Sequence, residues 1–115
     1  MSRTILIACL CLLTGACAAG GRLAWPGAGQ DAAEARGERF AHRACAGCHA
    51  VERTGDSRSA NAPPFRDLRI RFTAASLERR LADISRRGHY EMPPVFISED
   101  EARDIAAYVE TLGRP

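Results

Sequence analysis

The amino-acid sequence predicts an all-α fold in one small domain. Its 115 residues leave room for a single core. Three segments place apolar residues three and four positions apart, the spacing that gives a helix one buried face. Residues that start and stop helices flank these segments, and no stretch alternates as a half-buried strand does. We expect the folded domain over residues 31–113.

The first thirty residues are typical of an export signal followed by a tether. Arg3 precedes a continuous apolar run, Ile5–Leu13, which is too short to cross a membrane as a helix. Small residues follow this run, so residues 1–17 are predicted to form a signal peptide. Residues 18–30 are rich in Gly, Ala and Pro, which predicts a flexible linker.

Two processing sites compete at the end of this signal. Ala16-Cys17-Ala18 has the A-x-A pattern, which would free the protein by cleavage near Ala18. The segment Leu13–Cys17 is similar to a bacterial lipobox, in which Cys17 becomes the lipid-carrying first residue, although Thr14 replaces the usual aliphatic residue. Both alternatives stay open, and a lipid anchor at Cys17 is the only membrane contact that the sequence predicts.

The first helix is expected from Asp31 to Ala44. Asp31 is a good N-cap residue, with Glu34 three positions later, and Phe40 and Ala44 share an apolar face. Further along, Pro63-Pro64 predicts a rigid turn. A short helix should follow this turn and carry Phe65, Leu68 and Phe72.

Two longer helices should complete the domain. The middle one is expected to start near Thr73 and to end at Gly88, a residue type favoured just past a helix. The last one should start at Ser98, where Glu101 completes a capping box. Its buried stripe consists of Ala102, Ile105, Ala106, Val109 and Leu112, and Gly113 and Pro115 end it.

The strongest signal in the chain is Cys45-Ala46-Gly47-Cys48-His49. The pattern C-x-x-C-H is that of c-type haem attachment. Two thiols at this spacing can form thioethers to the two vinyl groups of haem, and the next residue then places an imidazole under the iron. The motif therefore predicts one covalently attached haem c, with Cys45 and Cys48 as anchors and His49 as a ligand of the iron.

Other uses of the two cysteines fit the sequence less well. A thioredoxin-like redox pair would lie beside a βαβ pattern, which is missing here. A structural zinc site needs four ligands, usually in two spaced pairs, and no second C-x-x-C exists. A disulfide between Cys45 and Cys48 would close a very short, strained loop.

The second axial ligand should come from a distant loop between two helices. Met92 is the natural choice, because it lies in the segment Gly88–Pro94, where two prolines would hold the backbone rigid. It is also the only methionine left after signal cleavage. His89 is the rival and would give two histidine ligands. His42, on the first helix, is expected to be a solvated surface residue.

With these residues in place, the chain resembles the small class I bacterial cytochromes c over residues 31–113. Gly37 and Phe40 resemble the Gly/aromatic pair of the family's N-terminal helix, and Tyr108 and Leu112 resemble their partners on the C-terminal helix. The resemblance implies the class I cytochrome c fold, with helices packed around one covalently bound haem. A small residue at Gly37 would permit close crossing of the two helices.

The resemblance also implies roles for residues around the haem. A proline after the motif would supply a backbone carbonyl to His49, and either Pro63 or Pro64 matches. The polar segment 51–62 between the motif and these prolines should be a surface loop. The pocket would be lined by Phe65, Leu68, Phe72 and Leu81, and an ordinary place in the core stays open for these four residues. The propionates could be held by Arg66, Arg69 or Tyr90, none of which is assigned.

The function that these expectations support is electron transfer rather than enzymatic catalysis. The protein is expected to be a periplasmic mono-haem carrier, soluble or lipid-anchored, that cycles between Fe(II) and Fe(III). Its partners would be redox proteins: a dehydrogenase, a cytochrome bc1-type complex or an oxidase. A formal charge of +2 is too near neutral to indicate nucleic acid. Two alternatives stay open: a haem c subunit of a periplasmic dehydrogenase or terminal oxidase, and a haem catalyst or gas sensor with a free sixth position.

Overall fold

The computed structural model describes residues 27–90, 92 and 94–115 and shows the predicted all-α architecture. The predicted signal peptide and most of the predicted linker lie outside these residues. Four helices follow one another along the chain: α1 (Ala28–Ala44), α2 (Phe65–Arg71), α3 (Ala74–Arg87) and α4 (Glu99–Thr111). Extended pairing in the described part of the chain is limited to one isolated bridge between His89 and Met92.

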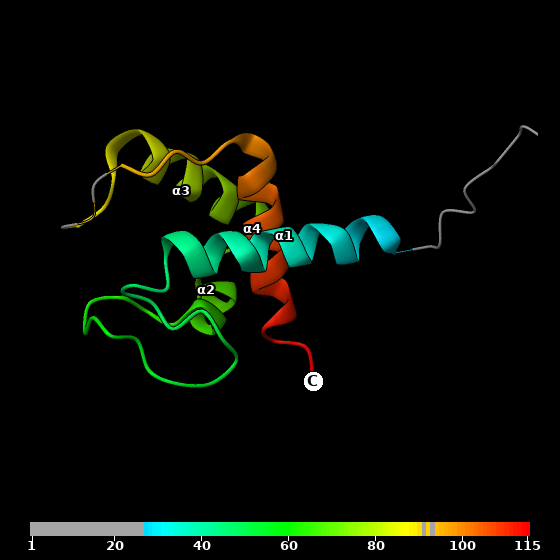
Figure 1. The fold of residues 1–115 in the computed structure, drawn as a ribbon, viewed down its shortest axis with the longest axis horizontal. Coiled ribbons are helices and arrows are strands. Elements are labelled where there is room, and N and C mark those ends of the chain that lie inside the picture. Colours follow the sequence, from blue (N-terminus) through cyan, green and yellow to red (C-terminus); the bar gives the residue numbers. More distant parts are fainter. Residues whose placement is uncertain (1–26, 91, 93) are drawn as a thin grey trace, which may run out of the picture.

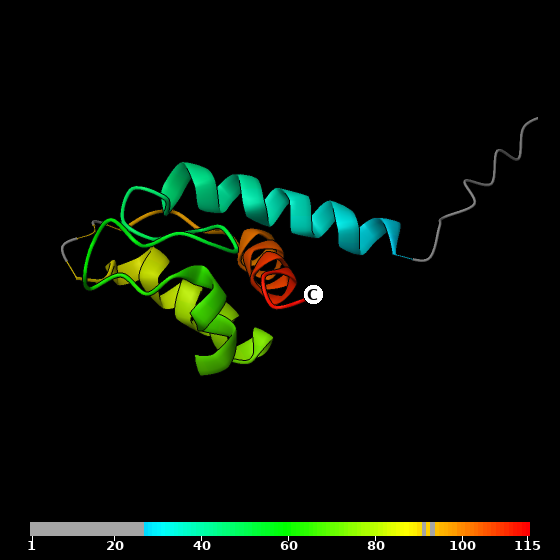
Figure 2. The same ribbon diagram turned by 90° about the horizontal axis from the view of Figure 1, so that it is seen from below.

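Helix α4 is the centre of the fold, because each of the other three helices packs against it. Helix α1 crosses α4 steeply, while α2 and α3 lie against α4 away from α1 (Figures 1 and 2). Ile105 and Val109 of α4 are fully buried, and the whole predicted stripe of this helix is buried as well. The apolar face that the spacing predicted for α4 is therefore the middle of the core.

The crossing of α1 over α4 is close because of Gly37. A Cβ atom at this position would overlap the backbone carbonyl of Asp104. Phe40, one turn further along α1, is buried, as are Tyr108 and Leu112 of α4. The helix contact implied by the family resemblance is thus present, with the glycine at the point of nearest approach.

The ends of α3 and α4 lie where the sequence predicted them. Thr73 and Ser98 are the N-cap residues, and each forms a reciprocal capping box with the residue three positions later. Gly88 follows α3 with a positive φ of 67°, a conformation that favours glycine. Three acidic residues in the first turn of α4 also complement the helix dipole.

The predicted start of α1 was wrong by three residues. The helix begins at Ala28, and its N-cap is Gly27, whose backbone is left-handed at φ 104°. Asp31 lies inside the first turn, where its backbone N–H donates to Gly27 O at 2.9 Å and its carboxylate complements the helix dipole. Alanine-rich sequence continues a helix easily, so three residues assigned to the linker are helical.

Candidate haem site

The cysteine motif forms a tight turn at the end of α1. The backbone N–H of Cys45 still donates to Ala41 O, and the N–H groups of Cys48 and His49 both donate to Cys45 O, at 3.1 and 3.0 Å. Cys45 is half-buried and Cys48 is exposed, and both thiols are free. Burial raises the pKa of the Cys45 thiol to about 11. The turn fixes the backbone of His49 next to the two cysteines.

His49 is oriented by a backbone carbonyl, and the carbonyl belongs to Pro63. The distance from His49 Nδ1 to Pro63 O is 2.7 Å. A carbonyl only accepts, so Nδ1 carries the proton, and Nε2 keeps the lone pair that a metal needs. The ring also meets Phe65 edge to face, with centroids 5.5 Å apart. Of the two prolines that the sequence left open, Pro63 provides the contact.

The loop after the motif folds back and fastens it. Ser59 N donates to Cys48 O at 3.1 Å, and Phe65 N donates to Ala50 O at 2.8 Å. Val51 is buried, and its carbonyl accepts a hydrogen bond from the Tyr108 hydroxyl at 2.9 Å. The rest of the segment 52–62 is exposed or half-buried, in agreement with the predicted surface loop.

Met92 lies on the loop between α3 and α4. Its backbone N–H donates to His89 O at 3.0 Å, and the residue is half-buried. Two positions before it, Tyr90 takes a positive φ of 49°, which is uncommon for a residue with a side chain. Further on, Ile97 N donates to Ser85 Oγ at 2.8 Å and ties the loop to α3.

His89 lies opposite His49. The two ring centroids are 6.0 Å apart, and the ring planes differ by only 11°. Nδ1 of His89 is buried and has no hydrogen-bond partner. Burial lowers the pKa of His89, with smaller contributions from His49 and Arg80, which favours the neutral ring. The structure therefore brings together His49 and the residue that the sequence offered as the rival to Met92.

The apolar residues predicted to line the site all lie in or against the core. Phe65 and Leu81 are buried, and Leu68 and Phe72 are half-buried and pack against the same cluster. Ala44, Cys45 and Ala46 also pack on this cluster. One side of the motif therefore continues directly into the hydrophobic core.

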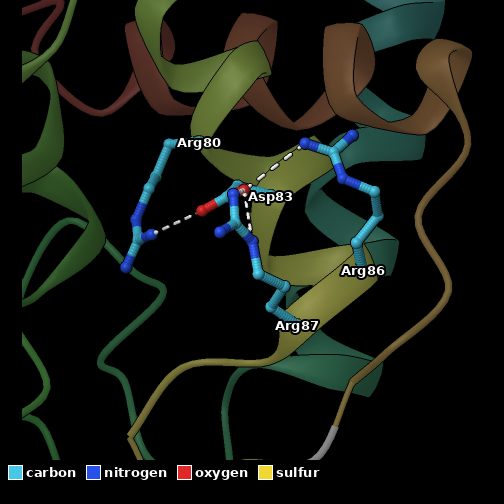
Figure 3. Close-up of polar contacts among 4 residues, drawn as sticks. All are labelled: Arg80, Asp83, Arg86 and Arg87. Atoms are coloured by element: carbon cyan, nitrogen blue, oxygen red, sulfur yellow. Dashed lines mark hydrogen bonds and ion pairs between the residues drawn. The ribbon is translucent and has the colours of Figure 1, made fainter.

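The exposed face of α3 beside the site carries a compact charge cluster. Asp83 accepts hydrogen bonds from Arg80 and Arg86, both at 3.3 Å, and from Arg87 (Figure 3). The Arg87 hydrogen bond is the main reason that the pKa of Asp83 lies below its usual range. One carboxylate thus holds three guanidinium groups, and the surface that they form has an excess of positive charge.

The other residues that the sequence analysis considered are exposed at the surface or have partners elsewhere. His42 is exposed, as expected, with its Nε2 2.9 Å from Glu52. Arg66 donates to the carbonyl of Gly55 at 2.8 Å, and Tyr90 is exposed. Sequence reasoning missed the Arg36–Asp104 ion pair, although an aspartate within the apolar stripe of α4 was a usable signal.

The residues present fit a covalently held haem. The motif supplies two thiols, His49 presents a free Nε2, and the opposite side holds a buried imidazole nitrogen without a partner. Within the part of the chain that is described, no helix is long and apolar enough to cross a membrane.

Comparison with known proteins agrees with this geometry. Residues 32–109 match the family described as "Cytochrome C oxidase, cbb3-type, subunit III". No curated protein and no solved structure shows a significant match to the chain. The match runs from the first turns of α1 to Val109 of α4. The fold is therefore that of cytochrome c, and the cofactor is covalently bound haem c. The chain belongs to this family of small c-type cytochromes.

Proposed function

We propose that this protein is a periplasmic mono-haem cytochrome c that carries single electrons between redox proteins. The observation that carries the proposal is the hydrogen bond from His49 Nδ1 to Pro63 O, because it leaves Nε2 available beside Cys45 and Cys48. The family match supports haem-based electron transfer. The apolar run and small residues of the predicted signal support the location.

In this proposal Cys45 and Cys48 would form thioethers with the haem, while His49 and Met92 would hold its iron. The haem supplies an iron that alternates between Fe(II) and Fe(III). The Pro63 carbonyl keeps the His49 ring in one orientation and increases its basicity. A thioether ligand raises the reduction potential. With His49 and Met92 both on the iron, the protein would leave no position for a substrate.

Partner proteins would dock near the loop that carries Met92. Tyr90 and Phe96 flank this residue in the chain, and they are 86% and 81% exposed. Exposed aromatic side chains of this kind are common at protein contact surfaces. The arginines around Asp83 add positive charge to the neighbouring helix. A small, transient contact of this composition suits electron exchange.

A second function, as the haem c subunit of a terminal oxidase or dehydrogenase complex, is favoured by the family match itself, whose description is that of an oxidase subunit. Purification of the native protein from its membrane and periplasmic fractions separates the two functions. A partner that co-purifies in fixed ratio identifies a subunit, and a chain recovered alone identifies a free carrier.

The haem attachment is tested by expression of the full chain together with a cytochrome c maturation system. We expect a pigment that stays with the protein during acid-organic extraction, with one haem per chain in the alkaline pyridine spectrum. Cys45→Ala and Cys48→Ala should each leave one thioether and shift the pyridine band, whereas the exposed Arg58→Ala serves as the matched control. Colourless protein, or pigment that is fully extracted, would refute the proposed function.

The role of Met92 is tested by the substitution Met92→Ala. The variant should retain its haem, lose the weak far-red band of ferric methionine ligation and have a lower reduction potential, because a thioether donor has been removed. Redox titration of wild type and variant under the same conditions gives the comparison. Equal potentials in the two proteins would rule out Met92 as a ligand.

A further inference from the structure

His89 has the features of a ligand that the proposed site does not use. Its ring lies nearly parallel to that of His49, at a centroid distance of 6.0 Å. Its Nδ1 is buried and has no hydrogen-bond partner, which is rare for a polar atom in a folded protein. A metal ion that accepts the lone pair of an imidazole would satisfy such an atom.

The distance between the two rings matches this interpretation. An imidazole nitrogen binds a metal at ~2 Å and lies about 1 Å from the centre of its own ring, so two imidazoles on opposite sides of one metal have centroids ~6 Å apart. The observed separation is 6.0 Å. The two rings are stacked in this structure, and stacking also allows this spacing. Stacking alone does not explain the unpartnered nitrogen.

The backbone keeps His89 and Met92 together. The isolated bridge pairs these two residues, and Met92 N donates to His89 O at 3.0 Å. Gly88 and Tyr90, on either side of His89, both have positive φ values, 67° and 49°. The segment therefore turns sharply at His89 and brings it into the same loop that carries Met92.

We propose that His89 is a reserve axial ligand, which binds the haem iron whenever Met92 leaves it. In this exchange the Fe–S bond to Met92 breaks, and the lone pair of a His89 ring nitrogen forms an Fe–N bond. No electron is transferred and no proton is released. Because a thioether raises the potential relative to an imidazole, the exchange lowers the potential of the carrier. The inference rests on the proposed function, since it needs the haem in place.

Few other residues could replace Met92. The chain contains no lysine, so the most common amine ligand is absent. Within the described residues the remaining histidine is His42, which is exposed on α1 and paired with Glu52 at 2.9 Å. His42 therefore provides a matched control for His89.

The test compares the holoproteins of Met92→Ala, Met92→Ala/His89→Gln and Met92→Ala/His42→Gln. We expect the first and third to be low-spin in the ferric state, with the electron paramagnetic resonance signal of two imidazole ligands. The variant without His89 should be high-spin, and after reduction it should bind carbon monoxide readily. A high-spin Met92→Ala protein, or a low-spin protein that lacks both Met92 and His89, would overturn the proposal.

A second measurement needs no substitution at Met92. Treatment of the wild-type holoprotein with hydrogen peroxide transfers one oxygen atom to the sulfur of Met92 and leaves water. The product is the sulfoxide, a more polar group, which should release the iron to His89. Wild type should then give the two-imidazole spectrum, and His89→Gln should become high-spin. A high-spin oxidised wild type contradicts the proposal. Covalent haem is measured first in each sample, so a protein without it refutes the proposed function, whereas covalent haem with the wrong spin state refutes only the exchange.

Discussion

At the scale of single residues, Gly37 determines how closely α1 approaches α4. A Cβ atom there would overlap Asp104 O and lie 2.9 Å from Ile105 N. Both of these are backbone atoms of a helix, so they cannot rotate away as the end of a side chain could. Any side chain at this position has to push the two helices apart.

Gly37→Ala should destabilise the protein by about 1–3 kcal/mol, the usual cost of forcing extra atoms into a packed contact. Chemical denaturation of the ferric holoprotein measures this change. Gly29→Ala, in the same helix, is the control, because a Cβ at Gly29 meets nothing within 4 Å. Equal stability of the two variants would show that the helices do not cross closely at Gly37.

Tyr108 joins α4 to the loop that follows the cysteine motif. Its hydroxyl donates to the buried Val51 carbonyl at 2.9 Å. Burial is the main cause that raises the pKa of Tyr108 to about 12, with help from the negative charges of Glu52 and Glu38. The Tyr108 phenol therefore keeps its proton up to a higher pH in the folded protein than in the unfolded chain.

This difference predicts that stability falls as the pH rises through the alkaline range. The unfolded tyrosine loses its proton near pH 10, whereas the folded one keeps it until about pH 12. Between these values the unfolded chain binds fewer protons, so the free energy of unfolding decreases with pH and the contribution is fully present below pH ~10. Denaturation at several pH values should show this slope in wild type.

Tyr108→Phe is the matched variant for this measurement. It should lack the part of the alkaline slope that Tyr108 causes. At neutral pH it should also be less stable by about 1–3 kcal/mol, because the Val51 carbonyl stays buried without its donor. Identical slopes in the two proteins would assign the alkaline loss to other groups.

The residues that a sequence can specify are those whose signal is local. The cysteine motif needs only five adjacent positions. The choice between Pro63 and Pro64 could not be made, because the two neighbours are equivalent until the loop folds back onto His49. The partner of Asp104 could not be found either, since Arg36 is 68 positions away.

At the scale of the elements, an ion pair connects α1 and α4. Arg36 Nε donates to Asp104 Oδ2 and Arg36 Nη2 donates to Asp104 Oδ1, both at 2.7 Å. Asp104 is buried, while the Arg36 side chain is 52% exposed. Loss of the arginine would leave a buried carboxylate without its counter-charge. This change should cost more folding stability than the removal of both charges together.

Arg36→Gln should therefore lower the melting temperature, and the double variant Arg36→Gln/Asp104→Asn should recover part of the loss. A double-mutant cycle on the holoprotein gives the coupling between the two side chains. Arg39→Gln, on the same helix, controls for the removal of a positive charge. Strictly additive effects would show that the two groups do not stabilise each other.

The helix ends show which element boundaries a sequence can specify. The N-caps Thr73 and Ser98 act through side chains that reach a residue three positions later. Gly88 ends α3 through its backbone freedom. These predictions were confirmed. Asp31 had the same type of side chain but lies inside α1. A good cap residue does not stop a helix when the residues before it are also good helix formers.

At the scale of the whole molecule, the core is small, so we expect the cofactor to supply much of the stability of the fold. Among the described residues the largest fully buried side chains are Ile105 and Val109, and residues such as Leu68, Phe72 and Ile84 are only partly covered by protein. A ligand that binds the folded state alone stabilises that state. A covalent haem that covers these residues would act in this way permanently.

The chain produced without haem should lose most of its cooperative unfolding transition. Cys45→Ala/Cys48→Ala, expressed like the wild type, gives such a protein, and helical circular dichroism during heating compares the two. The haem protein should melt in one sharp step, and the variant should show weak helicity and a broad melt. Equal melting curves would mean that the four helices are stable without the cofactor.

The central place of α4 has a consequence for the order of events during synthesis. A ribosome releases the N-terminal segments first, so α1, α2 and α3 emerge before the helix on which all three pack. Until α4 has been made, these three helices lack the helix against which they pack. In an export that proceeds from the N-terminus, the two thiols of the motif would reach the attachment machinery before α4, and the last helix would close the structure only afterwards.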